Sequence, residues 1–290
     1  MVEPDYSRIL DANGKGEAMG HECFEVSIEG KVAHVKMSRP ERRNAMTAAF
    51  WRELPAVVKE LDAGGKVRAL VLSSTGPHFC AGLDLQMFQT SDAIGGSTLE
   101  ARQKFRRELE RLQASLDCLA QARFPVIAAV QGGCIGGGVD MAAACCLRYA
   151  TRDAYFVIQE INLGMMADVG TFNRLPKQLP EAVVRELGYT GDKLPAERAE
   201  RLGFVNGLFE SHAALVEGAL AVARRIAAKA PVAVAATKEM VSYSRDHSVA
   251  ESFAYLNALQ PGIFSIEDIR RSVAAKGGAA EYADLPARGG

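Results

Sequence analysis

Residues 124–150 read FPVIAAVQGGCIGGGVDMAAACCLRYA, and this stretch decides the class of fold. It begins with a short, nearly continuous apolar run, which is typical of a strand buried on both faces. A glycine-rich turn comes next, and the residues from 135 onward start a helix. The chain then returns at residues 148–159, RYATRDAYFVIQ, as a strand. Because strand, glycine-rich turn and helix follow one another in this order, the sequence predicts an α/β fold.

The same alternation is present on the N-terminal side of this stretch. Residues 23–40 alternate apolar and polar side chains around a Glu-Gly pair, which predicts a β-hairpin. Residues 47–65 have apolar side chains at helical spacing, and residues 67–74 read as a second buried strand. A long polar helix is expected around residues 98–122. From residue 170 onward the pattern is helical, interrupted by Gly and Pro.

The composition of all 290 residues is that of an ordinary globular protein, with 48% hydrophobic and 24% charged residues. A formal net charge of −1 gives no electrostatic reason to expect a nucleic acid or a membrane as partner. Six cysteines without a C-x-x-C pair, and five histidines without ligand spacing, predict a reduced compartment and no metal site. The first residues show neither a secretory nor a mitochondrial leader pattern, and no apolar run reaches spanning length. We therefore expect a cytoplasmic protein without a membrane segment.

Two glycine-bearing turns follow the predicted buried strands, HFCAGLDL at residues 78–85 and QGGCIGGGVD at residues 131–140. In the second turn, glycines open a helix, so their unpaired N–H groups and the helix dipole favour an anionic ligand. One N–H from each turn, converging on a single point, would form an oxyanion hole. Taken alone, either turn is better explained by the ordinary use of glycine in tight turns, because short glycine motifs are weak evidence of a site.

Two carboxylates lie in the segment QEINLGMMADVGTFNRLPK, residues 159–177, among small and apolar residues. They are Glu160 and Asp168. A carboxylate in an apolar wall must be paired or have its pKa raised, and both conditions are common at catalytic sites. The alternative is that both are exposed loop residues, and that Asp140, in the first turn of its helix, only stabilises that helix.

Together with SRPERRNAM at residues 38–46, these stretches resemble the crotonase family, the enoyl-CoA hydratase/isomerase superfamily, from about residue 24 to about residue 275. The resemblance implies a superhelix of ββα turns with a helical C-terminal trimerisation region. The chain then divides into a mobile N-terminal tail (1–20), a core with an acyl-CoA site (21–215), a helical oligomerisation region (216–280) and a tail (281–290). A homotrimer or homohexamer is the implied assembly.

The resemblance also assigns the binding groups by position. The backbone N–H groups of Leu83 and Gly137 would hold the thioester oxygen as it becomes an enolate. Arg42, Arg43 and Ala81 would contact coenzyme A, which is part of the substrate. No metal ion or redox cofactor is implied.

Three acids distinguish this chain within the family. Asp140 and Glu160 stand where hydratases look to have two glutamates, and Asp168 stands where they generally have a small residue. An acid at all three positions most resembles the branch that converts 3,5-dienoyl-CoA to 2,4-dienoyl-CoA. That reaction removes a proton from C2 and adds one at C6, and the two carbons are too far apart for one carboxylate.

By position, Glu160 is the base at C2 and Asp168 the acid at C6, although the two roles can be exchanged. Asp140 would hold or tune Glu160, because neighbouring carboxylates do not easily both ionise. Two other functions stay open. One is a 2-enoyl-CoA hydratase, in which Asp140 and Glu160 activate water, and the other is a non-catalytic or RNA-binding protein of the same fold.

Overall fold

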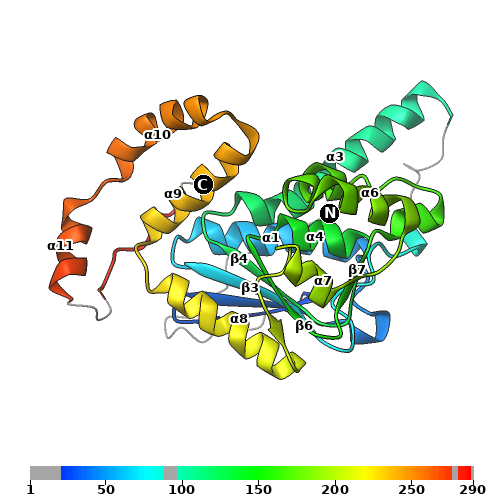
Figure 1. The fold of residues 1–290 in the computed structure, drawn as a ribbon, viewed down its shortest axis with the longest axis horizontal. Helices are drawn as coiled ribbons and strands as arrows, with labels where there is room; N and C mark the ends of the chain where they lie inside the picture. The colour runs from blue at the N-terminus through cyan, green and yellow to red at the C-terminus, as the bar shows by residue number, and fades with distance from the viewer. Residues whose placement is uncertain (1–20, 88–96, 276–279, 289–290) are drawn as a thin grey trace, which may run out of the picture.

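The computed structural model describes residues 21–87, 97–275 and 280–288. Its larger sheet has six strands in the order β1-β2-β3-β4-β6-β9 (Figure 1). The first pair is antiparallel and is the predicted hairpin, and every other pair is parallel. The strands are β1 (Phe24–Glu29), β2 (Val32–Met37), β3 (Ala69–Ser74), β4 (Val126–Val130), β6 (Leu147–Thr151) and β9 (Leu208–Phe209).

A second, smaller sheet has three strands. It consists of β5 (Gly133–Ile135), β7 (Tyr155–Val157) and β8 (Leu194–Pro195). Cys80 pairs with this smaller sheet through an isolated parallel bridge to Cys134 of β5. After β4 and after β6, the chain therefore leaves the large sheet and adds a short strand to the small one. A helix follows β5, so the ββα superhelix is confirmed.

Helices cover both faces of the large sheet (Figure 1). On one side lie α1 (Ala48–Ala63), α3 (Leu99–Gln121) and α4 (Gly137–Ala144), and on the other lies α8 (His212–Ala227). The short elements around the site are η1 (Pro40–Arg42), η2 (Gln159–Leu163), α5 (Thr171–Arg174), η3 (Leu175–Lys177), α6 (Glu181–Thr190) and α7 (Ala196–Arg201). None of the helices in the described ranges is long and apolar enough to cross a membrane.

Successive residues of the central strands point into two different cores. Leu70 and Leu72 of β3 face α1 and α3, whereas Ala69 and Val71 face α8. This is the period of two that a strand imposes, and it explains why these strands are apolar throughout. Helix α8 presents a residue every fourth position to the sheet: Leu215, Ala219, Ala223 and Ala227. The alanines let the helix approach the sheet closely.

The structure corrects three details of the predicted elements. The segment RYATRDAYFVIQ is not one strand, because a turn at residues 152–153 divides it between β6 and β7, which belong to different sheets. The second glycine turn contains a strand of its own, β5. Two short strands, β8 and β9, interrupt the C-terminal helical pattern.

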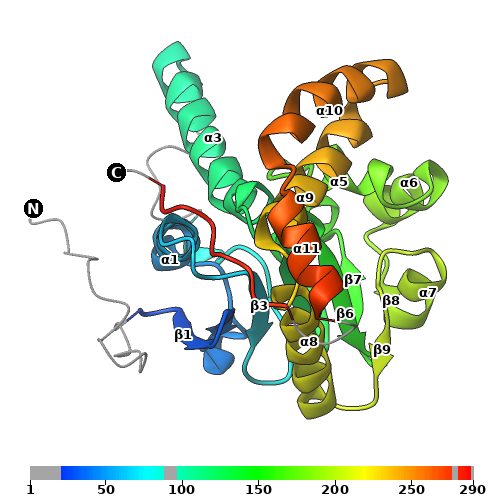
Figure 2. The ribbon, with the colours of Figure 1, turned by 90° about the vertical axis from the view of Figure 1, so that its left-hand side faces the viewer.

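The C-terminal helices form an arm that stands away from the sheet (Figures 1 and 2). They are α9 (Pro231–Asp246), α10 (Val249–Ile263) and α11 (Ile266–Ala274). The predicted boundary between residues 215 and 216 falls inside α8, which packs on the sheet and so belongs to the core. The predicted mobile tail, residues 1–20, lies outside the described residues.

Residues 281–288 of the predicted tail run back along the core toward α1, together with residue 280 (Figure 2). Asp284 accepts hydrogen bonds from Lys31 and Arg68, and Arg288 forms an ion pair with Asp62 at 3.2 Å. Gly65 has a positive φ and lies so close to this segment that a Cβ would meet the Leu285 carbonyl. We call residues 280–288 the C-terminal strap.

Candidate active site

The two glycine turns lie side by side because backbone hydrogen bonds join them. The Cys80 N–H donates to the Gly133 carbonyl at 3.2 Å, and the Ile135 N–H donates to the Cys80 carbonyl at 3.0 Å. Gly82 has a φ of +84°, and a Cβ there would lie 2.8 Å from the Ile135 carbonyl oxygen. Both the conformation and the close approach therefore require glycine at position 82.

The backbone N–H groups of Leu83 and Gly137 are free to bind a ligand. Neither has a hydrogen-bond acceptor within the part of the chain that the structure describes. The two amides also lie near one another, since a Cβ on Gly82 would be 3.4 Å from the Gly137 nitrogen and one on Gly137 would be 3.9 Å from the Leu83 nitrogen. Met46 packs against Gly137 and fixes the Leu83 segment through bonds to the Gly82 carbonyl and the Asp84 N–H. This pair of amides suits a developing oxyanion.

Asn44 attaches residues 38–46 to the first glycine turn. Asn44 is buried and has a φ of +53°, a conformation in which asparagine is enriched. Its side-chain amide donates to the Thr75 and His78 carbonyls at 2.9 and 3.1 Å, and its Oδ1 accepts from the Arg39 N–H. The sequence analysis did not select Asn44. The signal that could have found it is its place in the motif SRPERRNAM, after two arginines and before Met46.

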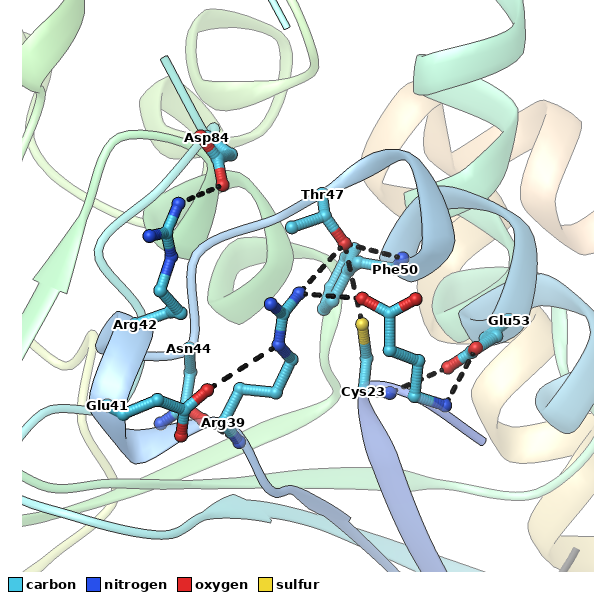
Figure 3. Close-up of polar contacts among 10 residues, drawn as sticks. Cys23, Arg39, Glu41, Arg42, Asn44, Thr47, Phe50, Glu53 and Asp84 are labelled. Carbon is cyan, nitrogen blue, oxygen red and sulfur yellow. Dashed lines mark hydrogen bonds and ion pairs between the residues drawn. The ribbon is translucent and has the colours of Figure 1, made fainter. Parts of the chain in front are cut away.

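The three residues expected to contact coenzyme A lie together at the first glycine turn. Arg42 and Arg43 are exposed, and the Arg43 carbonyl accepts a hydrogen bond from the Ala81 N–H at 3.0 Å. The Arg42 guanidinium is 3.5 Å from the Asp84 carboxylate (Figure 3). Asp84 also accepts from the Gln86 N–H, which orders the start of the loop after Leu83. The arginines are therefore placed to meet an anionic group that arrives from solvent.

Asp140 is a buried carboxylate in the first turn of α4, with a relative exposure of 1%. Its Oδ1 accepts hydrogen bonds from both the backbone N–H and the hydroxyl of Thr171, at 2.5 and 2.7 Å. Its Oδ2 is buried and has no partner among the described residues. Burial raises the pKa of Asp140 to about 6, against the lowering effect of the Thr171 hydrogen bonds and of Arg174.

Glu160 is half-buried in η2 and packs against Gly136. A Cβ on Gly136 would lie 3.0 Å from Glu160 Oε1, so this glycine leaves space for the carboxylate. Glu160 Oε2 is buried without a partner in the described part of the chain. Burial, and next the nearby charge of Asp140, raise the pKa of Glu160 to about 7. Its half-buried position argues against the exposed-loop interpretation.

Asp168 is also half-buried, and burial raises the pKa of its carboxyl. Its charge contributes to the raised pKa of both Asp140 and Glu160, so the three carboxylates lie within electrostatic reach of one another. Gln113 of α3 donates to the Asp168 carbonyl at 2.8 Å and fixes the backbone there. Sequence reasoning missed both Gln113 and Thr171, because their partners are 55 and 31 residues away along the chain.

Two other conspicuous side chains have structural roles. His78 accepts a hydrogen bond from the Gly133 N–H on Nδ1 at 3.0 Å and so supports the second glycine turn. Cys80 is fully buried, and burial raises the pKa of its thiol to about 12.

Met165 and Met166 line a mainly apolar cavity of about 740 Å³ beside α6, and none of the three carboxylates lines it.

The family model described as "Enoyl-CoA hydratase/isomerase" matches residues 27–281, which is most of the chain. This chain belongs to the enoyl-CoA hydratase/isomerase family. The members most similar in sequence include the Homo sapiens "Delta(3,5)-Delta(2,4)-dienoyl-CoA isomerase, mitochondrial". It is 40% identical over 267 residues, which is 90% of this chain and 81% of the human protein. The peroxisomal protein of the same name from Arabidopsis thaliana is 34% identical, over 88% of this chain and 93% of its own length.

Solved structures of family members have the same fold. An enoyl-CoA hydratase from Mycobacterium tuberculosis H37Rv superimposes with a TM-score of 0.77 at 32% identity, over 91% of this chain and 99% of the hydratase. The fold is therefore shared with hydratases, whereas sequence identity over most of the chain is greater to the human dienoyl-CoA isomerase.

Proposed function

We propose that this chain is a Δ3,5-Δ2,4-dienoyl-CoA isomerase. The observation that carries the proposal is the third acid, Asp168, whose charge acts on Asp140 and Glu160 across the same site. A hydratase adds water across one double bond, at the adjacent carbons C2 and C3, and so needs no acid at C6. The relatives named as dienoyl-CoA isomerases, with 34 to 40% identity over most of the chain, support the same function.

The first chemical step is removal of a proton from C2 of the 3,5-dienoyl thioester. The amides of Leu83 and Gly137 hold the thioester oxygen, and the C2 proton becomes acidic as negative charge moves onto that oxygen. One such donor contributes about 3 kcal/mol in comparable acyl chemistry. Glu160 is the base. A pKa of about 7 suits a group that must accept a proton near neutral pH and release it in each cycle.

The second step is protonation at C6. The C2 carbanion is conjugated with both double bonds, so its charge extends to C6, where Asp168 delivers a proton. The double bonds then lie at positions 2 and 4. One proton has left and one has arrived, and the oxidation level is unchanged, so the reaction needs no redox cofactor. Exchange with solvent returns Glu160 to its anionic form and Asp168 to its protonated form.

Binding of the coenzyme A part of the substrate is assigned to Arg42, Arg43 and the backbone at Ala81. The exposure of the two arginines, and the hydrogen bond from the Ala81 N–H to the Arg43 carbonyl, support this assignment. A cytoplasmic location stays a prediction from the sequence, because the human and Arabidopsis relatives carry mitochondrial and peroxisomal names. Cell fractionation of the native host would test it.

The arm formed by α9 to α11 supports a homotrimer or homohexamer. It exposes large apolar side chains, which a globular protein normally covers. They are Val241, Val249, Phe253, Phe264, Ile266, Ile269 and Val273. A neighbouring subunit is the proposed cover.

An absorbance assay with purified protein tests the proposal. The substrate is 3,5-octadienoyl-CoA, and the product is recognised by the absorption of the conjugated 2,4-dienoyl thioester. A parallel reaction offers 2-enoyl-CoA and water. Rapid appearance of the conjugated product with little hydration is expected. Fast hydration without isomerisation would establish the hydratase alternative and remove Asp168 from the mechanism.

A further inference from the structure

The carboxylate of Asp140 is hydrogen-bonded asymmetrically. Both donors that reach it come from Thr171, at the start of α5, and both bind Oδ1. Thr171 itself has an exposure of 0%, so water does not compete for its hydroxyl. The other oxygen of Asp140 and the Oε2 oxygen of Glu160 are both buried without a donor in the described ranges. One side of the carboxylate is therefore fully engaged and the other is open.

The groups that face Asp140 come from four directions. Glu160 of η2 and Asp168 lie within electrostatic reach, Arg174 of α5 supplies a positive charge, and Cys134 of β5 is a neutral neighbour. Burial raises the pKa of the Cys134 thiol well above its usual value. Arg174 is already engaged by Asp117 of α3. Among the described residues, the Thr171 N–H and hydroxyl are the only donors bonded to the Asp140 carboxylate.

We propose that Thr171 is a positioning residue for the isomerisation. By placing two donors on Oδ1, Thr171 makes Asp140 the ionised member of the Asp140–Glu160 pair. Hydrogen bonds to a carboxylate favour its charged form, and two neighbouring carboxylates do not readily share that form. The ionised Asp140 then makes Glu160 the more basic carboxylate. This inference rests on the proposed function.

The consequence for catalysis follows from base strength. A base at C2 works best when its conjugate acid is weak enough to hold the proton near the working pH. If Asp140 lost its preference for the anion, the shared proton would move to Asp140. Glu160 would then ionise at a lower pH and be a weaker base. Thr171 therefore determines which carboxylate of the pair holds the proton, and its effect is not limited to the position of Glu160.

The test is the pH dependence of kcat/KM for 3,5-octadienoyl-CoA in the wild type, Thr171→Val and Thr171→Ser. Valine keeps the shape and the backbone N–H but removes the hydroxyl, and serine restores the hydroxyl. Thr151→Val is the matched control, since Thr151 is also buried but its hydroxyl has no partner among the described residues. Circular dichroism and thermal unfolding verify that each variant is folded. If Thr171→Val does not fold, Thr171→Cys gives the same comparison with a weaker donor.

The expected result for Thr171→Val is a shift of the acidic limb to lower pH by about one unit, with a lower plateau and an unchanged KM. Thr171→Ser and Thr151→Val should keep the wild-type midpoint. A Thr171→Val enzyme with reduced rate but an unshifted limb would show a purely structural role and overturn the inference. Absence of isomerisation in the wild type would instead refute the proposed function, so the two failures are distinguishable.

Discussion

Glu160 has a folded-state pKa of about 7, whereas a glutamate in an unfolded chain titrates near 4.5. The folded state therefore binds this proton more tightly than the unfolded state does. The stability that comes from the group is fully present below about pH 4.5 and is lost as the pH rises through about 7. The same sign holds for Asp140, whose pKa is raised to about 6. At neutral pH the site is thus poised for proton transfer at the expense of stability.

We predict that Glu160→Gln raises the melting temperature at pH 8 and leaves it nearly unchanged at pH 4.5. Neutralising the group removes the cost of a buried charge, which corresponds to at most roughly 3 kcal/mol for a shift of this size. The same variant should lose isomerase activity by roughly 10²- to 10⁴-fold and stop exchange of the C2 proton with solvent. Thermal unfolding at the two pH values is the measurement, with Glu100→Gln at an exposed site as control. An equal change in melting temperature at both pH values would contradict the prediction.

Asp168 separates isomerisation from the chemistry that the rest of the family shares. We predict that Asp168→Asn keeps the fold and the binding of coenzyme A but lowers isomerisation by roughly 10²- to 10⁴-fold, because no acid remains for C6. Exchange of the C2 proton should continue, since Glu160 and the oxyanion hole are intact. The absorbance assay and deuterium incorporation at C2 measure the two steps separately. Asp153→Asn, in the exposed turn between β6 and β7, is the control. Turnover near the wild-type rate would exclude Asp168 from the mechanism.

The residues of the site differ in how far sequence could identify them. Asp140, Glu160 and Asp168 stand in motifs whose order along the chain is distinctive, so a resemblance was enough to select them. Asn44, Gln113 and Thr171 act through hydrogen bonds to residues distant in sequence, and no local pattern encodes those partners. Such supporting side chains become recognisable only when the fold brings the segments together.

At the scale of elements, the sequence predicted the regular helices and the buried strands but missed the short strands of the second sheet. Periodicity identifies α1 and α3 because each is many turns long, and a hairpin such as β1-β2 alternates over six residues per strand. Strand β5 has three residues inside a glycine-rich turn, which is too short for any period. The turn between β6 and β7 contains Arg152 and Asp153 in place of Gly or Pro, so a single aspartate is its only turn signal, which is too weak to divide the strand.

The turn that opens α4 offers a test of how backbone shape serves the site. Gly136 has a φ of +53°, and its missing side chain makes room for Glu160. We predict that Gly136→Ala lowers kcat by at least roughly tenfold, because the new Cβ displaces the carboxylate from C2. Gly30→Ala is the matched control, since Gly30 has a φ of +60° in the β1-β2 turn and a Cβ added there would meet nothing within 4 Å. Both variants should be less stable than the wild type, because an alanine at a positive φ strains the backbone. Equal catalytic rates in the two variants would show that Gly136 serves conformation alone.

At the scale of the whole molecule, the strap attaches the C-terminal end of the arm to the N-terminal part of the core. The chain leaves the core after α8, forms α9 to α11, and returns through the strap to Lys31 and Arg68, at the N-terminal ends of β2 and β3 (Figure 2). Tyr282 at the start of the strap is hydrogen-bonded to Ser272 of α11, and its carbonyl accepts from Arg68. The arm is thereby held at both ends, which favours one orientation of its apolar residues. The oligomerisation region stays a prediction from the sequence. The sequence did not indicate this second attachment, because single charged residues in a polar terminus form no pattern.

The exposed apolar side of that arm leads to a prediction about assembly. We expect the wild type to have about three or six times the 31.1 kDa mass of one chain, measured by size-exclusion chromatography with light scattering. Phe253 on α10 and Phe264 at its C-terminal end are 61% and 60% exposed, and replacing both with Glu should yield a monomer, because burial of two charges in an apolar interface is unfavourable. Phe105→Glu on α3, which is outside the arm, should keep the wild-type mass. A monomeric wild type would refute the proposed assembly, whereas a double variant with unchanged mass would place the subunit interface on another face of the molecule.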